Sequence, residues 1–204
     1  MKTAKICWSL GSLLINVVIG LFIYLMVTGP KGLAERFQFV NDNWTLYSGH
    51  WRAEFLIMIL VAIGAVYFAQ QFKSIGWTII AIGQFIILWT YPLMLGGYRN
   101  TPFELANMAN QMAIITFNFG NLVFFSGLFL MYLKSELLQS WLRYLALTCS
   151  GIITLLFFIV CIDVLEWKDV LMAAPLVNVM YLINAYYGFK IDVHPEFKVI
   201  THKT

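Results

Sequence analysis

Charged residues are scarce in this chain. Asp, Glu, Lys and Arg together make up 11% of its 204 residues, whereas an ordinary soluble domain carries about 25%. A water-soluble fold of this size needs more polar surface, so water is a poor candidate for its solvent. The net charge is only +3 and the sequence has no basic tract. Nucleic acid is therefore not expected as a partner.

Cysteine and histidine are also few. The three cysteines, Cys7, Cys149 and Cys161, lie in or beside apolar stretches without C-x-x-C spacing. Neither a disulfide framework nor a structural zinc site is therefore expected. The three histidines form no H-E-x-x-H motif, and the chain has no P-loop and no haem-type histidine pair within its apolar runs. Because these motifs are absent, the sequence has no signature of a bound cofactor, and none is expected.

Long apolar runs take the place of these features. Hydrophobic residues make up 61% of the chain, and a membrane-spanning helix requires roughly 20 such residues in succession. The sequence predicts an all-α, polytopic transmembrane helix bundle of about six helices, near residues 6–28, 54–72, 75–95, 103–133, 142–163 and 170–189. We expect one transmembrane domain over residues 1–189 and a polar cytoplasmic tail over residues 190–204.

The first apolar run, residues 6–28, exceeds the roughly 7–15 residues of a cleavable signal and lacks an A-x-A site. We therefore expect it to be retained as the first helix. Basic residues then favour an orientation, because short loops rich in Lys and Arg stay in the cytoplasm. With the N-terminus inside, eight basic residues lie inside: Lys2, Lys5, Lys73, Lys134, Arg143, Lys190, Lys198 and Lys203. Five lie outside: Lys31, Arg36, Arg52, Arg99 and Lys168. The balance predicts an N-in/C-in, multi-pass protein of the cell membrane.

Small residues recur along the third predicted helix. Gly76, Gly83, Thr90 and Gly97 follow one another at intervals of seven and share one face. Small side chains allow helix backbones to approach closely in lipid, where dispersion and short polar contacts replace the hydrophobic drive. This stripe predicts a close helix–helix interface.

Amide side chains mark the fourth and sixth predicted helices. In the fourth, Asn107, Gln111, Asn118 and Asn121 fall within an arc of about 80° at 100° per residue. The sixth contributes Asn178, Tyr181 and Asn184. An amide without a partner in hydrocarbon costs several kcal/mol, so these groups must meet one another, water or a ligand. One interpretation is a hydrogen-bond network that joins helices. The other is a polar cavity lined by Asn118, Asn121, Asn178, Tyr181 and Asn184, with Asp163 at its outer mouth.

Ionisable residues gather on the predicted outer side. His50 and Glu54 are spaced i,i+4, and Asp163 and Glu166 are spaced i,i+3. The favoured interpretation is solvated loop ends with surface ion pairs, and no metal. The alternative is a divalent-cation site, because a histidine and three carboxylates are suitable ligands if the helices that carry them are adjacent.

One stretch resembles a known family. Residues Phe125–Lys134, FSGLFLMYLK, and the following Trp141–Leu145, WLRYL, are similar to a family of small six-helix bacterial inner-membrane proteins known only as a domain of unknown function. The similarity covers roughly a quarter of the chain. It implies a bacterial inner-membrane location, and it implies no activity and no functional residues.

Three functions remain open from the sequence. The first is non-enzymatic: a bundle in the lipid bilayer that binds or passes a small or amphipathic solute through a polar intramembrane cavity. The second is a structural or assembly subunit that pairs with a membrane protein partner or with further copies of itself. The third is a metal-assisted membrane enzyme with an outer-face site at His50, Glu54, Asp163 and Glu166.

Overall fold

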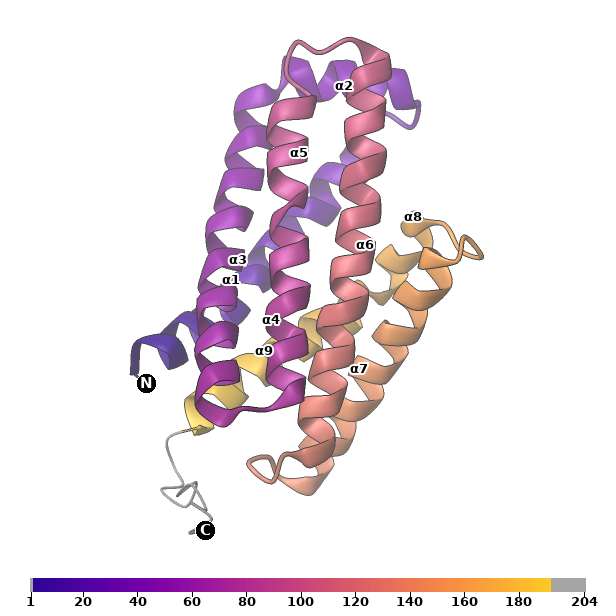
Figure 1. Cartoon of the computed structure of the whole chain (residues 1–204). Coiled ribbons are helices and arrows are strands. Elements are labelled where there is room, and N and C mark those ends of the chain that lie inside the picture. The colour runs from indigo at the N-terminus through magenta and orange to yellow at the C-terminus, as the bar shows by residue number, and fades with distance from the viewer. Residues whose placement is uncertain (1, 192–204) are drawn as a thin grey trace.

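The computed structural model describes residues 2–191, apart from the side chains of residues 167 and 168. The expected tail, residues 190–204, therefore lies almost wholly outside the described residues. Within the described residues the chain is all-α (Figure 1). Its elements in order are α1 Lys2–Thr28, α2 Leu33–Asp42, α3 Trp44–Phe72, α4 Ile75–Leu88, α5 Thr90–Gly97, α6 Phe103–Lys134, α7 Ser140–Cys161, α8 Trp167–Val170, the 3-10 turn η1 Leu171–Ala173, and α9 Ala174–Lys190.

The predicted membrane-type helices are confirmed in kind. Among the described residues, five stretches are long and apolar enough to cross a membrane: Lys2–Thr28, Trp44–Phe72, Ile75–Gly97, Phe103–Lys134 and Ser140–Cys161. The sixth expected span, residues 170–189, is divided between α8, η1 and α9. Helix α9 has 17 residues, which is shorter than the roughly 20 that a span needs. The count of six spans and their orientation stay predictions.

The long helices form a closed ring. Helix α1 packs on α3 and α9, and the ring continues from α3 through α4, α6 and α7 back to α9. Helix α2 lies across one end of the bundle, which we call the α2 end (Figure 1). The start of α1 lies at the opposite end, which we call the N-terminal end. The finish of α9 lies there too, because Gly188 contacts Ser9.

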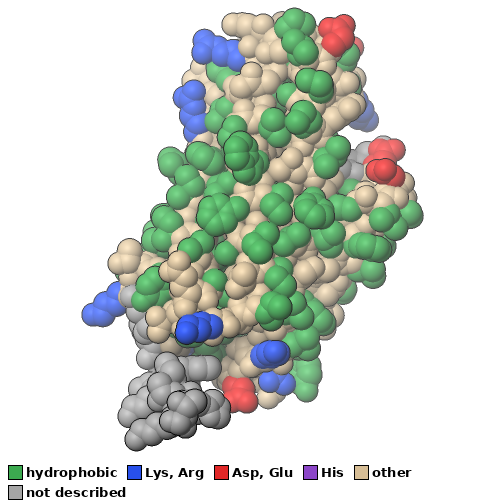
Figure 2. Space-filling model, in the orientation of Figure 1, with side chains coloured by type: hydrophobic (Ala, Val, Ile, Leu, Met, Phe, Trp, Pro, Cys, Tyr) green, Lys and Arg blue, Asp and Glu red, His purple; other side chains and the backbone are tan. Residues whose placement is uncertain are grey.

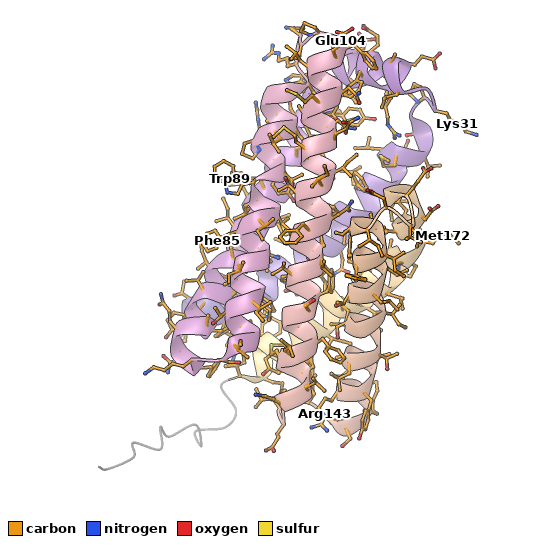
Figure 3. The ribbon with its side chains drawn as sticks, turned by 45° about the vertical axis from the view of Figure 1, so that its right-hand side comes forward. Lys31, Phe85, Trp89, Glu104, Arg143 and Met172 are labelled. Carbon is orange, nitrogen blue, oxygen red and sulfur yellow. The ribbon has the colours of Figure 1, made fainter. Side chains whose placement is uncertain are left out.

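The lateral surface of the bundle is apolar. Figure 2 shows hydrophobic side chains spread over the flank, while charged side chains gather at the two ends and near α8. In Figure 3, Lys31 and Glu104 lie at the α2 end, Arg143 lies at the N-terminal end, and Phe85 and Trp89 project from the flank between them. Trp89 is 69% exposed and Phe85 is 55% exposed. Such a surface suits hydrocarbon rather than water.

Glycines bring α4 and α6 into close contact, as the small-residue stripe predicts. A Cβ added at Gly83 would lie 2.5 Å from the Phe124 nitrogen, and one added at Gly127 would lie 2.6 Å from the Ile80 nitrogen. Gly76 in turn lies against the Met131 backbone. Because backbone faces backbone, only glycine fits at these positions.

Proline divides the third expected helix. Helix α4 ends at Leu88, Trp89 forms a turn, and α5 begins at Thr90. Pro92 has no N–H for the Leu88 carbonyl, and its ring would clash with that carbonyl in a continuous helix. Pro175 causes no such break, because it lies at the first positions of α9, where the missing N–H is not needed.

The expected loop between the first two spans is largely helical. It contains α2, and α3 begins at Trp44, ten residues before the expected start at Glu54. Hydropathy marks where a helix enters apolar surroundings and not where it begins. Tyr47, His50 and Trp51 lie in the first turns of α3 and are buried. His50 and Glu54 therefore belong to one continuous helix inside the protein.

Candidate functional site

A cavity of about 420 Å³ lies in the half of the bundle nearer the α2 end. Its walls come from α1, α2, α3, α5 and α6, and Phe157 of α7 together with the α8–η1–α9 segment closes the remaining side. The lining is mostly apolar and rich in aromatic side chains, among them Phe22, Phe37, Tyr47, Trp51, Tyr98 and Phe117. A site of this kind can hold the apolar body of a small molecule.

The unequal lengths of α6 and α7 leave room for the cavity. Helix α6 has 32 residues and α7 has 22, which correspond to about 48 Å and about 33 Å at 1.5 Å per residue. The last turn of α7, at Val160 and Cys161, lies beside Ile114 and Asn118 of α6, well inside the α6 start. In Figure 1, α8 accordingly lies far below α2. Of the described lining residues, Leu33 and Glu166 are the exposed ones, and they mark the mouth between α2 and the α7–α8 turn.

The deepest lining residues from α3, α5 and α6 are polar, whereas those from α1, α7 and α9 are the apolar Ile19, Phe157 and Val177. Helices α3 and α6 run away from the α2 end, so their last lining residues, Glu54 and Asn121, are the deepest. Helix α5 runs toward that end, so Thr90 and Tyr91 are its deepest. We call Glu54, Thr90, Tyr91 and Asn121 the floor of the cavity. The site thus joins apolar walls to a polar floor.

His50 and Glu54 lie one turn apart on α3 and face the same cavity. The His50 Nε2 atom is 3.7 Å from the Glu54 Oε2 atom, and their side chains are 2% and 15% exposed. This distance exceeds that of a normal hydrogen bond. The two groups therefore form an ion pair only when the imidazole is protonated, and neither is fixed by the other.

Several polar atoms at the floor lack hydrogen bonds. The Tyr91 side chain lies beside the Glu54 carboxyl. Its hydroxyl nevertheless meets the geometry of a hydrogen bond with no described residue, and neither does the hydroxyl of Thr90. Tyr91 is 2% exposed and Thr90 is 5% exposed. A buried polar group without a partner costs about 1–3 kcal/mol, so the floor has unused capacity for a polar ligand group.

The upper wall carries one fixed cation. The Arg36 Nη2 atom donates to the Met26 carbonyl oxygen at 3.0 Å and so satisfies an end of α1. Tyr98, in the same wall, donates its hydroxyl hydrogen to the Asn110 Oδ1 atom at 2.5 Å. Burial raises the pKa of Tyr98, and the nearby Arg36 charge opposes that rise. The phenol is accordingly held as a neutral donor.

The predicted amide residues fall into separate environments. Asn121 lies at the cavity floor, and its Nδ2 atom donates to the Phe117 carbonyl at 2.8 Å. Asn184 joins three helices, since its Oδ1 atom accepts from the Tyr132 hydroxyl at 2.6 Å and its carbonyl accepts from Trp8 Nε1 at 2.8 Å. Asn184 therefore takes part in the kind of interhelical network that was one of the two interpretations.

The other predicted residues lie beside the cavity or away from it. Tyr181 lies under the floor, near Glu54, with its ring stacked on Phe124 at 6.0 Å. Asn118 lines a second depression between α6 and α7. Asn178 lies outside the main lining, and its Oδ1 atom has no hydrogen-bond partner within residues 2–191.

Asp163 has a local structural role at the end of α7. It is exposed and adopts a left-handed φ of 58°. Its N–H donates to the Val160 carbonyl, and the Val164 N–H donates to the Ile159 carbonyl. This pair of bonds is a Schellman motif, which ends a helix through a left-handed residue. Asp163 lines the second depression and not the main cavity.

The four metal candidates are only partly brought together. His50 and Glu54 lie deep in the cavity, Glu166 lies at its mouth, and Asp163 lies outside its lining. Among the described residues, no three His, Cys, Asp or Glu side chains gather closely enough to hold a metal ion.

Sequence reasoning missed several lining residues. The sequence places Arg36 in a loop, and it places Thr90 and Tyr91 in the third expected helix, with Thr90 on the small-residue stripe. Pro92, directly after Tyr91, is the sequence signal for the break between α4 and α5.

No protein-family model, curated protein or solved structure matches this chain. The resemblance of residues 125–134 and 141–145 to the six-helix bacterial family therefore stays a prediction.

Proposed function

We propose that this chain is an integral membrane protein that binds an amphipathic small molecule in the cavity beneath α2. Its membrane part comprises the five long apolar helices together with α9 as a sixth, shorter segment, in an N-in/C-in orientation. Basic residues support this orientation, because the N-terminal end carries six in the described part of the chain: Lys2, Lys5, Lys73, Lys134, Arg143 and Lys190. A bacterial inner-membrane location would follow from the family resemblance.

The observation that carries the proposal is the cavity itself. Its volume of about 420 Å³ lies within the roughly 300–1,000 Å³ of small-molecule sites, which are usually apolar with a few placed polar groups. The walls and floor match that division. An apolar chain would contact the aromatic walls, and a polar head would reach Glu54, Thr90 and Tyr91.

Binding is favoured over open passage. Below the floor, Tyr181 is 2% exposed and Phe124 is 0% exposed, and their stacked rings fill the centre of the bundle. A solute that enters at the mouth between Leu33 and Glu166 is therefore held at the floor. Movement to the N-terminal end would require a change in how α6 and α9 pack.

Filling the cavity tests the proposal. Ala113 lines it and is 3% exposed, so Ala113→Phe places a ring in the space that a ligand would occupy. Ala53→Phe is the matched control, because Ala53 is an exposed residue of α3 outside the lining. Both variants, purified in lipid nanodiscs, are titrated with decanol as the amphipathic probe. We expect saturable binding to the wild type and to Ala53→Phe, and an affinity at least tenfold lower for Ala113→Phe. Equal affinities for all three proteins, or only non-saturable uptake, contradict the proposal.

A further inference from the structure

We infer that the cavity selects amphipathic cations, namely amines or quaternary ammonium compounds with an apolar body, through the carboxyl group of Glu54. The inference rests on the proposed function and names the chemical class of its ligand.

The charges that line the cavity favour a cation. Its described lining contains two carboxyl groups, Glu54 and Glu166, and one permanent cation, Arg36. Arg36 is held near the mouth by its bonds to the Met26 carbonyl oxygen and sulfur. At the floor, the ion-pairing neighbour of Glu54 is His50, at 3.7 Å. The floor therefore has a carboxyl group without a permanent counter-charge, in surroundings where an unpaired charge is costly.

The aromatic residues around Glu54 suit a cation as well. Trp51 lies one turn from Glu54 on α3 and lines the cavity. Its ring centroid is 6.0 Å from that of Tyr47 and 5.2 Å from that of Tyr98. Phe22 stacks over the His50 ring at 6.3 Å. Faces of Trp, Tyr and Phe attract a cation within about 6 Å, and a group of such rings is a common means of binding quaternary ammonium groups.

The hydroxyl groups of the floor add acceptors. Those of Tyr91 and Thr90, both at least nine-tenths buried, have lone pairs with no donor among the described residues. Together with the Glu54 carboxyl oxygens they can accept hydrogen bonds from an ammonium N–H, and hydroxyl groups rotate freely to do so. An ammonium head group would stabilise the ionised form of the Glu54 carboxyl, whereas a neutral head group would not, and an anionic head group would be repelled by that form.

The test uses three probes with ten carbons in a chain and different charge: decylammonium, decanol and decanoate. Each is titrated into wild-type protein, Glu54→Gln and Glu104→Gln in nanodiscs of zwitterionic lipid. Glu54→Gln keeps the shape of the side chain and removes its charge. Glu104→Gln is the control, because Glu104 is an exposed carboxylate at the α2 end (Figure 3). Thermal unfolding of each variant reports whether its fold is retained.

We expect the wild type to bind the cation at least tenfold more tightly than decanol, and decanoate most weakly. Glu54→Gln should lose tenfold or more of the cation affinity, equivalent to 1.4 kcal/mol, while its decanol affinity changes less than twofold. Glu104→Gln should bind all three probes like the wild type. Equal losses for cation and decanol, or a wild-type preference for decanoate, overturn the inference. If Ala113→Phe removes decanol binding but Glu54→Gln leaves the cation affinity intact, the cavity function stands and the cation selectivity is wrong.

Discussion

Replacing Gly83 by alanine should destabilise the bundle more than any comparable change at an open glycine. The added methyl group would lie 2.5 Å from the Phe124 nitrogen and 2.7 Å from its Cα. Ordinary van der Waals contact requires about 3.5–4.0 Å between such atoms. Because the opposing atoms are backbone, they cannot turn aside as a side chain could. Helices α4 and α6 must therefore separate by about 1 Å.

The magnitude follows from what this separation removes. Overpacking in a well-packed interior typically costs about 1–3 kcal/mol, and we expect the upper part of that range because the whole α4–α6 interface is displaced. Alanine also gains about 1 kcal/mol over glycine in helix propensity, so the net loss should be about 1–2 kcal/mol. Gly127→Ala should behave alike, since its Cβ would lie 2.6 Å from the Ile80 nitrogen. The double variant should lose less unfolding free energy than the sum of the two single losses, because one separation of α4 from α6 relieves both clashes.

Equilibrium unfolding in mixed micelles, followed by circular dichroism, measures these differences. Gly20→Ala in α1 is the control, because nothing lies within 4 Å of a Cβ at Gly20. It should gain stability from helix propensity alone. The reasoning is refuted if Gly83→Ala is as stable as Gly20→Ala, or if the two interface variants add fully.

Three further changes test other parts of the structure. Tyr132→Phe removes the donor to the Asn184 Oδ1 atom and should cost about 1 kcal/mol, measured by the same unfolding assay; an unchanged stability would mean that the network contributes nothing. Asp163→Gly relieves the left-handed φ of 58°, so stability should rise by up to about 1 kcal/mol with decanol affinity unchanged; a loss of affinity would assign Asp163 to the binding site instead. Single cysteines at Lys31 and Glu136, both exposed, in a background without the native cysteines, report orientation. A membrane-impermeant thiol reagent should label the first in intact cells and the second only in inverted vesicles, and the reverse result would exclude the N-in orientation.

The long helices and the α4–α6 interface could be predicted because they depend on local pattern. Apolar runs longer than about 20 residues have few alternatives to a membrane-type helix. Glycines at intervals of seven mark one helix face whatever lies opposite. The spacing of Gly76 and Gly83 therefore predicts a close helix–helix interface. It does not predict that the opposing helix is α6.

Helix α2 shows where hydropathy fails. Residues Leu33–Asp42 include Glu35, Arg36 and Asp42, so their average polarity indicates a loop. The segment is helical because Phe37 and Val40, three residues apart, share one face and are buried beneath it. Only two of the five apolar side chains in this segment are buried, and two positions are too few to stand out as a helical period along the sequence. They are nevertheless enough to fix a short helix over an apolar space.

The amides of α6 show a different limit. Asn118 and Asn121 are three residues apart, which separates them by about 60° around a helix. On a helical wheel they share one face. In the bundle, Asn121 faces the main cavity and Asn118 faces the depression beside α7. Two residues about 60° apart on α6 can therefore face two different surfaces of the bundle. The position of α7 determines that Asn118 faces the depression and Asn121 faces the main cavity.

The same dependence on neighbours governs His50 and Glu54. Their i,i+4 spacing is compatible with one helical face, but the polar residues before Glu54 favour solvated loop ends as the interpretation from sequence. In the structure the two side chains lie one turn apart on α3 but face a cavity instead of water. This is because α3 begins ten residues earlier than expected, α2 covers the end of the bundle, and α7 ends before it reaches α2. A carboxyl group at a loop end has abundant water as its partner, whereas at the floor of an apolar cavity it has His50, two unpaired hydroxyl groups and whatever enters. The chemistry of Glu54 is thus set less by its own sequence neighbours than by the difference of ten residues in length between α6 and α7.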